Sequence, residues 1–378
     1  MKRAGGMTRR RWVGVALILG AVGLVGGLIL RVWSDPWPPR LVIRLPEPSF
    51  GWGFSPDSRW LETSAAASDK GQELSSWDLA TGKIRRTPPE LLICQRSYVA
   101  DGRSYVGASP GGEYPSEVVW VDVATGSIRA CFAPAPLVPR FPRLVNDDRS
   151  IRAFLSADGV IREVVTWEIA AGTATRRPFL GPVGANGEMQ PQLATPDGRI
   201  LVYYDWASDA FQLWDAEAGR PIGGLLQTPM TRTSRPRWPG IKLTPDGKTL
   251  VIARHNGQTE VWDVASARLV RRVATPWDGF YTLNTAITPD GRILAMGGTG
   301  PSPPSILTSA WSLVGNLFPA LRDEGIREVV VVDLITGRRL ARLLGADEPL
   351  ISPDGRTLVT QERDESYSVR TIPRLDAR

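Results

Sequence analysis

The sequence predicts an all-β fold in which seven copies of one four-stranded unit pack side by side around a ring. A Ser/Thr-Pro-Asp-Gly phrase recurs about once every 45 residues, and a second phrase that begins with Trp-Asp or Val-Asp follows most copies. The residues between the two phrases show the alternation of strands and turns. A unit of this size cannot bury both of its own faces, so neighbouring copies must pack on one another.

The copy at residues 241–274 shows how one unit folds. A short apolar strand reaches a tight turn at Gly247, a residue that can adopt a positive φ. A run of branched apolar residues then predicts a buried strand, and Asn256 with Gly257 predicts a hairpin into a third strand. A further turn leads to the fourth strand. Four antiparallel strands of this length form one blade of a β-propeller.

Seven such units follow one another, with the turn aspartate at Asp57, Asp101, Asp148, Asp197, Asp246, Asp290 and Asp354. The third unit has no glycine in this turn, and the second has Val121 where tryptophan is expected. Asp-Gly pairs have turn geometry and tryptophans pack between blades, so we interpret the repeated residues as structural. These blade-motif residues are Asp57, Trp77, Asp101, Asp197, Trp214, Asp246, Trp262, Asp290 and Asp354.

The seventh unit supplies only three strands before the chain ends. Residues 41–45, with the sequence LVIRL, read as a lone strand at the other end of the repeat. We expect this N-terminal strand to complete the last blade and so close a seven-bladed propeller of four-stranded antiparallel blades. Closure of this kind removes the exposed strand edges that a part-built blade would leave.

Over residues 41–374 the repeated phrases resemble those of the WD40 family, in a degenerate bacterial form. The excess of arginine over lysine also indicates a GC-rich bacterial genome. One departure is clear: WD40 repeats carry a histidine in each blade, whereas this chain has a single histidine, His255. The resemblance implies a scaffold that binds proteins. It also implies that the Pro-Asp-Gly turns and the Trp-Asp turns share one face of the disc.

An uncharged apolar stretch at residues 12–30 predicts a transmembrane helix before the propeller. Its length of about 28 Å matches the hydrocarbon core of a bilayer. Trp12 and Trp33 stand at its ends, and basic residues precede it, so we expect a cytoplasmic N-terminus and an extracytoplasmic propeller. The alternative is a cleaved signal peptide. The predicted parts are a basic tail (1–11), the anchor (12–33), a proline-rich linker (34–39) and the propeller (40–378).

The net charge of +6 comes from the N-terminal region. Removing the six basic residues that flank the apolar stretch leaves 39 basic residues against 39 acidic ones. The folded body is therefore neutral by count, and we expect no nucleic-acid partner.

The few histidines and cysteines exclude several kinds of site. One histidine and two cysteines cannot make a histidine-based triad, a multi-histidine metal centre or a zinc ribbon. We predict no catalytic residue, no metal and no cofactor. Asp205, Asp209, Asp323 and Glu324 could offer oxygen ligands to calcium, but no EF-hand pattern supports this. Cys94 and Cys131 fall near opposite edges of one blade, and their pairing stays open.

The sixth unit carries an insertion at about residues 299–326. Leu307, Trp311, Val314 and Phe318 follow the spacing of an amphipathic helix, and Pro319 bends or ends it. Two interpretations stay open: the helix is a recognition element or lid, or it folds back to bury its apolar stripe on its own blade. These four residues are the candidate partner-binding residues.

The sequence therefore predicts a membrane-tethered, non-catalytic propeller that binds a protein or peptide as a scaffold or sensor. The alternative is an extracytoplasmic propeller that binds a small ligand, or an enzyme, using the central channel. That function needs charged residues that converge on the innermost strands, which here look mostly apolar. A structural part of an envelope assembly is a third possibility, and the oligomeric state stays open.

Overall fold

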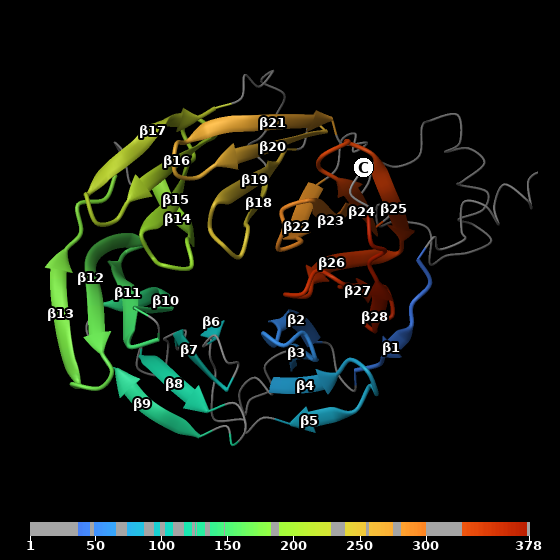
Figure 1. Ribbon diagram of the computed structural model, residues 1–378, viewed down its shortest axis with the longest axis horizontal. Coiled ribbons are helices and arrows are strands. Elements are labelled where there is room, and N and C mark those ends of the chain that lie inside the picture. Colours follow the sequence, from blue (N-terminus) through green and yellow to red (C-terminus); the bar gives the residue numbers. More distant parts are fainter. Residues whose placement is uncertain are drawn as a thin grey trace, which may run out of the picture.

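The computed structural model describes residues 37–45, 49–65, 74–86, 94–98, 103–108, 117–122, 125, 127–132, 137–146, 148–182, 189–227, 239–254, 257–274, 281–299 and 327–375. These residues form strands β1 to β28, arranged in seven four-stranded sheets. The sheets stand like blades around a ring, with one strand of each sheet nearest the centre (Figure 1). The all-β, seven-bladed architecture with antiparallel blades is as the sequence predicts.

Blades 1 to 4 follow the chain in order, each from its innermost to its outermost strand. Blade 1 holds β2 (Ser49–Phe54), β3 (Trp60–Ala65), β4 (Leu74–Asp78) and β5 (Ile84–Arg86). Blade 2 holds β6 (Cys94–Tyr98), β7 (Ser104–Ala108), β8 (Val118–Asp122) and β9 (Ile128–Phe132). Blade 3 holds β10 (Val138–Val145), β11 (Ser150–Ala157), β12 (Val160–Glu168) and β13 (Thr173–Pro178). Blade 4 holds β14 (Met189–Ala194), β15 (Ile200–Asp205), β16 (Ala210–Asp215) and β17 (Arg220–Leu226).

Blades 5 to 7 complete the ring. Blade 5 holds β18 (Gly240–Leu243), β19 (Thr249–Ala253), β20 (Gln258–Asp263) and β21 (Arg268–Ala274). Blade 6 holds β22 (Tyr281–Ile287), β23 (Ile293–Thr299), β24 (Arg327–Asp333) and β25 (Arg339–Leu344). Blade 7 holds β26 (Ala346–Ile351), β27 (Thr357–Glu362), β28 (Tyr367–Thr371) and β1 (Leu41–Ile43).

Strand β1 is the outermost strand of blade 7, although it precedes blade 1 in the sequence. It pairs antiparallel with β28, with Leu41 opposite Val369 and Ile43 opposite Tyr367. The fourth strand of the last blade thus comes from the N-terminal side of the propeller. Ile43 is buried in one apolar cluster with Leu61 of blade 1, so β1 also joins blade 7 to blade 1.

The hydrophobic core lies between the blades. One cluster joins Val251 of blade 5 to Leu294 and Val330 of blade 6, and another joins Leu213 of blade 4 to Leu250 of blade 5. Among the described residues, such clusters join blades 2 to 7 in sequence and blade 7 to blade 1, as expected of a repeat whose units are not stable alone.

The turn between the first and second strands, the first turn, has the same hydrogen bonds in blades 1, 4, 5, 6 and 7. In blade 5 the Thr244 hydroxyl donates to Asp246 at 2.6 Å and accepts the N–H of Thr249 at 3.1 Å. Equivalent pairs are Ser55 with Asp57, Thr195 with Asp197, Thr288 with Asp290 and Ser352 with Asp354. The motif aspartates therefore hold these turns, while Asp101 lies outside the described residues.

The turn between the third and fourth strands, the outer turn, is closed by the aspartate of the Trp-Asp phrase. In blade 1 the Asp78 carboxylate accepts the N–H groups of Ala80 and Thr81, each at 2.9 Å. The preceding Trp77 is buried and donates its indole N–H to Thr63 at 3.0 Å, so a tryptophan–threonine bond is made without histidine. Since the strands alternate in direction, the first and outer turns share one face of the ring, here named the turn face.

The cysteines of blade 2 do not pair. Strands β6 and β9, which carry Cys94 and Cys131, are the two edges of their sheet, and Cys131 is a free thiol. Burial and the neighbouring Glu117 raise the pKa of this thiol to about 11.

Several predicted features lie outside the described residues: the anchor at 12–33, His255, and Leu307, Trp311, Val314 and Phe318 of the insertion. Within the described part of the chain, no helix is long and apolar enough to cross a membrane. Trp37, which the sequence assigns to the linker, packs against the cluster of blades 6 and 7, and its carbonyl accepts a 3.0 Å hydrogen bond from buried Arg370.

We expect Ile43→Ala to lower the free energy of unfolding by about 2–4 kcal/mol, because it empties a buried position between two blades. Val42→Ala is the matched control, because Val42 lies on the same strand with 46% of its surface exposed. Urea denaturation of the full chain measures both. Equal losses for the two variants would contradict the role assigned to β1.

Candidate functional site

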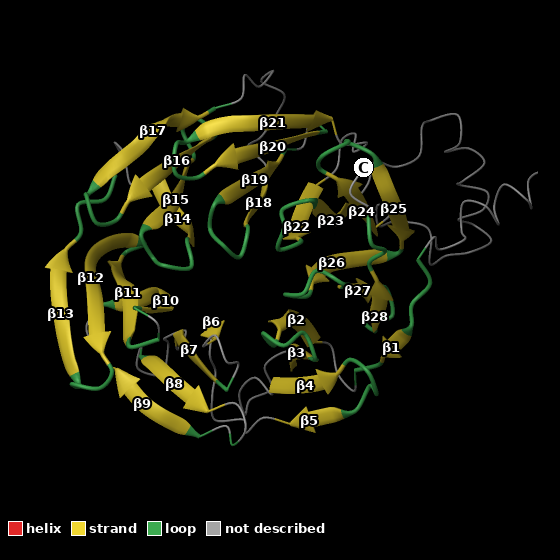
Figure 2. Ribbon diagram, viewed as in Figure 1, coloured by secondary structure: helices red, strands yellow, loops and turns green. Residues whose placement is uncertain are grey.

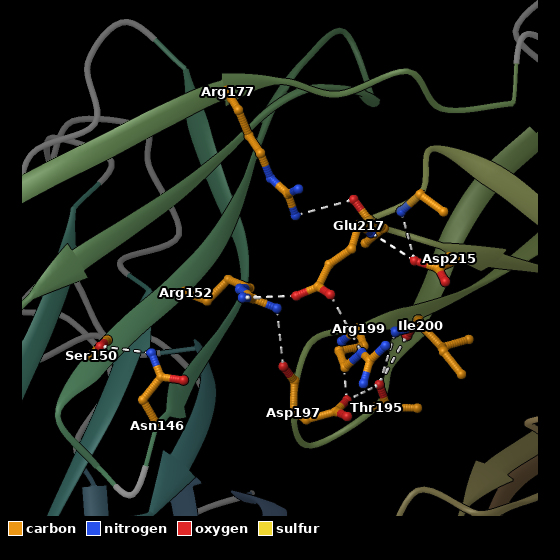
Figure 3. Close-up of polar contacts among 12 residues, drawn as sticks. Asn146, Ser150, Arg152, Arg177, Thr195, Asp197, Arg199, Ile200, Asp215 and Glu217 are labelled. Atoms are coloured by element: carbon orange, nitrogen blue, oxygen red, sulfur yellow. Dashed lines mark hydrogen bonds and ion pairs between the residues drawn. The ribbon is translucent and has the colours of Figure 1, made fainter.

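A cleft of about 430 Å³ opens between blades 3 and 4 on the turn face. Its apolar part comes from Leu144, Val145 and Pro196. Its polar part comes from the first turn of blade 3, strand β11, and both turns of blade 4 (Figure 3). The polar lining residues are Asn146, Asp148, Arg152, Asp197, Arg199 and Glu217.

The blade 4 side of the cleft is a regular first turn. Thr195 donates its hydroxyl to Asp197 at 2.6 Å, and Asp197 accepts the N–H of Arg199 at 3.0 Å. Gly198 has a φ of +64°, and a Cβ there would lie 3.2 Å from Cδ of Arg152. Glycine is thus favoured at this position both by backbone conformation and by the close approach of blade 3.

The blade 3 side is irregular. Leu144 pairs with Ile151, the second residue of β11, just as Leu243 of blade 5 pairs with the second residue of β19. By this register Val145 replaces the turn hydroxyl, and Asp148 stands at the glycine position with a φ of 63°. The assignment of Asp148 as the motif aspartate is therefore wrong by one residue, because the turn lacks the glycine that marks the register elsewhere.

Asn146 and Ser150 stabilise this irregular turn in place of the usual hydroxyl–carboxylate pair. The Asn146 amide donates to the Ser150 hydroxyl at 3.1 Å, and that hydroxyl donates to Glu168 at 2.9 Å. Asn146 also has a positive φ, of 55°, which asparagine tolerates better than most residues.

Arg152 bridges the two blades beneath the turns. Its Nη2 lies 3.4 Å from Oε1 of Glu217, and its Nη1 donates to the Asp197 carbonyl at 3.4 Å. Glu217 also contacts Nε of Arg199 at 3.6 Å. The Arg152 side chain is only 15% exposed, and its Nε is buried without a hydrogen-bond partner. A mostly buried guanidinium therefore retains donor capacity, held by two long contacts and directed toward the cleft (Figure 3).

The outer turn of blade 4 positions Glu217. Asp215 accepts the N–H groups of Glu217 and Ala218, each at 2.8 Å, and Arg177 donates to the Ala216 carbonyl at 3.2 Å. The Ala218 N–H bond, the Glu217 N–H bond and the nearby Arg199 hold the pKa of Asp215 below its usual value. Asp215 is thus a charged turn residue rather than a proton donor at neutral pH.

Sequence reasoning missed Arg152 and Glu217, although a signal was present. Glu217 occupies the outer-turn position that is Ala80 in blade 1 and Ala265 in blade 5. Arg152 is the third residue of the second strand, where blades 4, 5 and 7 have valine. A charge at a repeat position that is uncharged in most copies marks a departure from the structural pattern.

Of the other acidic residues considered from the sequence, Asp205 and Asp209 have structural partners, while Asp323 and Glu324 lie outside the described residues. Asp205 accepts the Ser208 hydroxyl and Asp209 accepts the Tyr204 hydroxyl, each at 2.5 Å. In the described part of the chain, no three His, Cys, Asp or Glu residues gather closely enough to hold a metal ion.

No family model matches the sequence, and no curated protein is similar to it in sequence. The β-propeller domain of Cps50 (Swd1) from Myceliophteria thermophila is similar in structure, with a TM-score of 0.61. The match covers 89% of this chain and 100% of that one at 13% sequence identity. At this identity the likeness shows the fold alone, and the chain has a WD40-like, seven-bladed β-propeller fold.

Asp215→Asn tests the charge of the cleft's outer turn. Because the folded pKa is depressed, ionised Asp215 adds stability above pH of about 4, and this stability is lost as the pH falls through the folded pKa. We expect the variant to melt lower than the natural chain at pH 7, with the difference shrinking as the pH falls below about 4. Val42→Ala, which removes no titratable group, is the control. A constant difference across this range would contradict the assignment.

Proposed function

We propose that this protein is a membrane-tethered, non-catalytic propeller that binds a protein or peptide partner as a scaffold or sensor. The observation that carries the proposal is the cleft between blades 3 and 4, where turns on a rigid scaffold surround an arginine whose Nη atoms are held by only two long contacts. Binding residues commonly lie on turns that a rigid fold positions.

The chemistry of the cleft suits a polar peptide segment. Arg152 offers N–H donors at the base of the cleft. At its rim, the half-exposed Glu217 offers acceptors, and the exposed Asn146 offers an acceptor and further donors. Leu144, Val145 and Pro196 add apolar surface. The donors and acceptors can form hydrogen bonds with the backbone of a bound peptide, while the apolar surface can contact one of its side chains.

The lining residues favour binding over catalysis. Among the described lining residues there is no histidine, cysteine or serine, so none of them forms a Ser–His or Cys–His pair of nucleophile and base. The two best-placed carboxylates are already engaged, Asp197 in its turn and Glu217 with two arginines.

The entry of the chain supports a site near the membrane. Leu41, the first residue of β1, lies against the outer turn of blade 1, since a Cβ on Gly82 would be 3.2 Å from Leu41 Cδ1. The chain therefore enters the propeller on the turn face, and Trp37 is already held by Arg370. With residues 12–33 in the bilayer, the intervening chain reaches at most about 14 Å. A partner in the cleft would then be bound close to the membrane surface.

Pull-down after crosslinking in native membranes tests the binding site. We expect Arg152→Met to reduce capture of the partner about tenfold, the effect of losing a well-buried interface arginine. Arg176→Met is the matched control, because Arg176 forms an exposed ion pair with Glu163 at 3.8 Å on the same blade, away from the cleft.

A chain lacking residues 299–326 separates the two candidate surfaces. Loss of capture only in this deletion would move recognition to the insertion in blade 6. Capture that survives both the deletion and Arg152→Met would contradict both surfaces. Melting temperatures of all variants establish that they are folded.

The anchor is tested separately by washing membranes at alkaline pH. We expect the full chain to stay in the membrane fraction and a chain lacking residues 1–33 to be released. Release of the full chain would contradict the membrane-spanning segment.

A further inference from the structure

The innermost strands carry exposed polar residues. Arg140 on β10, Gln190 on β14, Lys242 on β18 and Asn284 on β22 are all exposed, although these strands border the centre of the ring (Figure 2). Water therefore reaches the inner strands of at least four blades, and their side chains are available to a solute.

The register of the blades places two of the inner cations at the same height along the axis of the ring, here called one level. In every blade the third residue of the second strand pairs with one residue of the innermost strand. Arg152 pairs in this way with Arg143, and Val251 pairs with Lys242. Around the ring, the residues at this level are Gly53, Ser97, Arg143, Leu193, Lys242, Ala286 and Leu350. The level thus holds two cations and no acid.

These two cations have no carboxylate partner among the described residues. Lys242 has no hydrogen bond or ion pair there, and Arg143 donates only to the adjacent Pro142 carbonyl at 3.3 Å. Surrounding protein lowers the pKa of both groups, even though Lys242 is exposed to solvent. Lys242 is thus surrounded by protein although its side chain is accessible to water.

The described acids of the innermost strands lie elsewhere. Asp347 and Glu348 are at the start of β26, before its register shift, and burial and their mutual repulsion raise the pKa of Glu348. Arg327 is the cation that offsets this effect. The acidic pair of blade 7 is therefore balanced locally and leaves the charge at Arg143 and Lys242 uncompensated.

A backbone distortion precedes Arg143. Phe141 has a φ of 49°, and the pairing of β10 with β11 shifts between Arg140 and Arg143. A bulky residue in this conformation is strained, and strained residues of this kind cluster at functional sites. The distortion sets the course of the strand on which Arg143 lies.

We propose that Arg143 and Lys242 bind a small oxyanion, a phosphate group, at the centre of the ring. Leu193 of the intervening blade 4 occupies the same level between them, and a Cβ on Gly53 across the ring would meet no atom within 4 Å. Arginine provides two parallel donors to a phosphate and lysine adds a point charge. This site is separate from the cleft and does not rest on the proposed protein partner.

Calorimetric titration of the full chain in detergent with inorganic phosphate tests the proposal, with sodium chloride at equal ionic strength as the reference. We expect saturable binding that Lys242→Met and Arg143→Met each weaken at least tenfold. Lys248→Met is the matched control, because Lys248 lies on the first turn of the same blade with its side chain 80% exposed. Melting temperatures distinguish lost binding from lost folding.

Phenyl phosphate in a second titration distinguishes a free anion from a phosphate group on a larger ligand. Tighter binding than inorganic phosphate indicates a phosphorylated ligand, and weaker binding indicates the free anion. Absence of saturable binding by both probes overturns the proposal, as does binding that is unchanged in both Met variants.

Discussion

The hydrogen bond from a turn hydroxyl to an aspartate two residues later is the interaction on which the rest of the propeller depends. In blade 7 the Ser352 hydroxyl donates to Asp354 at 2.5 Å and accepts the N–H of Thr357 at 2.9 Å. These bonds fix the register between the innermost and second strands. A slip of one residue would turn every side chain to the opposite face of its sheet, and the clusters that join the blades would be lost.

Blade 3 shows the effect of replacing this interaction. Val145 stands where the hydroxyl should be, and the turn is instead built from Asn146 and Asp148 at positive φ. The innermost strand of the same blade contains the distorted Phe141. Both candidate sites include this blade, the cleft through Arg152 and the central site through Arg143. Local departures from a repeat are expected where a structure serves function rather than stability alone.

The architecture could be predicted from the sequence because each repeated residue has a direct physical role. The period predicts the packing of blades, Gly247 predicts a turn, and the lone strand at residues 41–45 predicts the completed seventh blade. The repeat pattern aligns the degenerate third turn one residue out, because this turn has neither the hydroxyl nor the glycine that fixes the alignment elsewhere.

The sites could not be predicted in the same way. Arg152 and Glu217 are 65 residues apart and meet only because adjacent blades pack together. Lys242 looks like a single charge in an apolar strand and Arg143 is one of two arginines in β10, and only the register of seven separate strand pairs places them at one level. The expectation that the innermost strands are mostly apolar missed this alignment. Leu307, Trp311, Val314 and Phe318 stay a prediction.

The two sites share one strand pair, and this has an electrostatic consequence. Arg143 and Arg152 are directly opposite each other on β10 and β11, so their side chains start from the same face of the sheet. Like charges in this arrangement repel, and among the described residues only Arg152 of the two has a carboxylate partner, Glu217. An oxyanion at Arg143 would reduce this repulsion and so change the affinity of Arg152 for a partner. By linkage, a partner that contacts Arg152 would change the affinity for the oxyanion by the same factor. A scaffold built in this way would also act as a sensor.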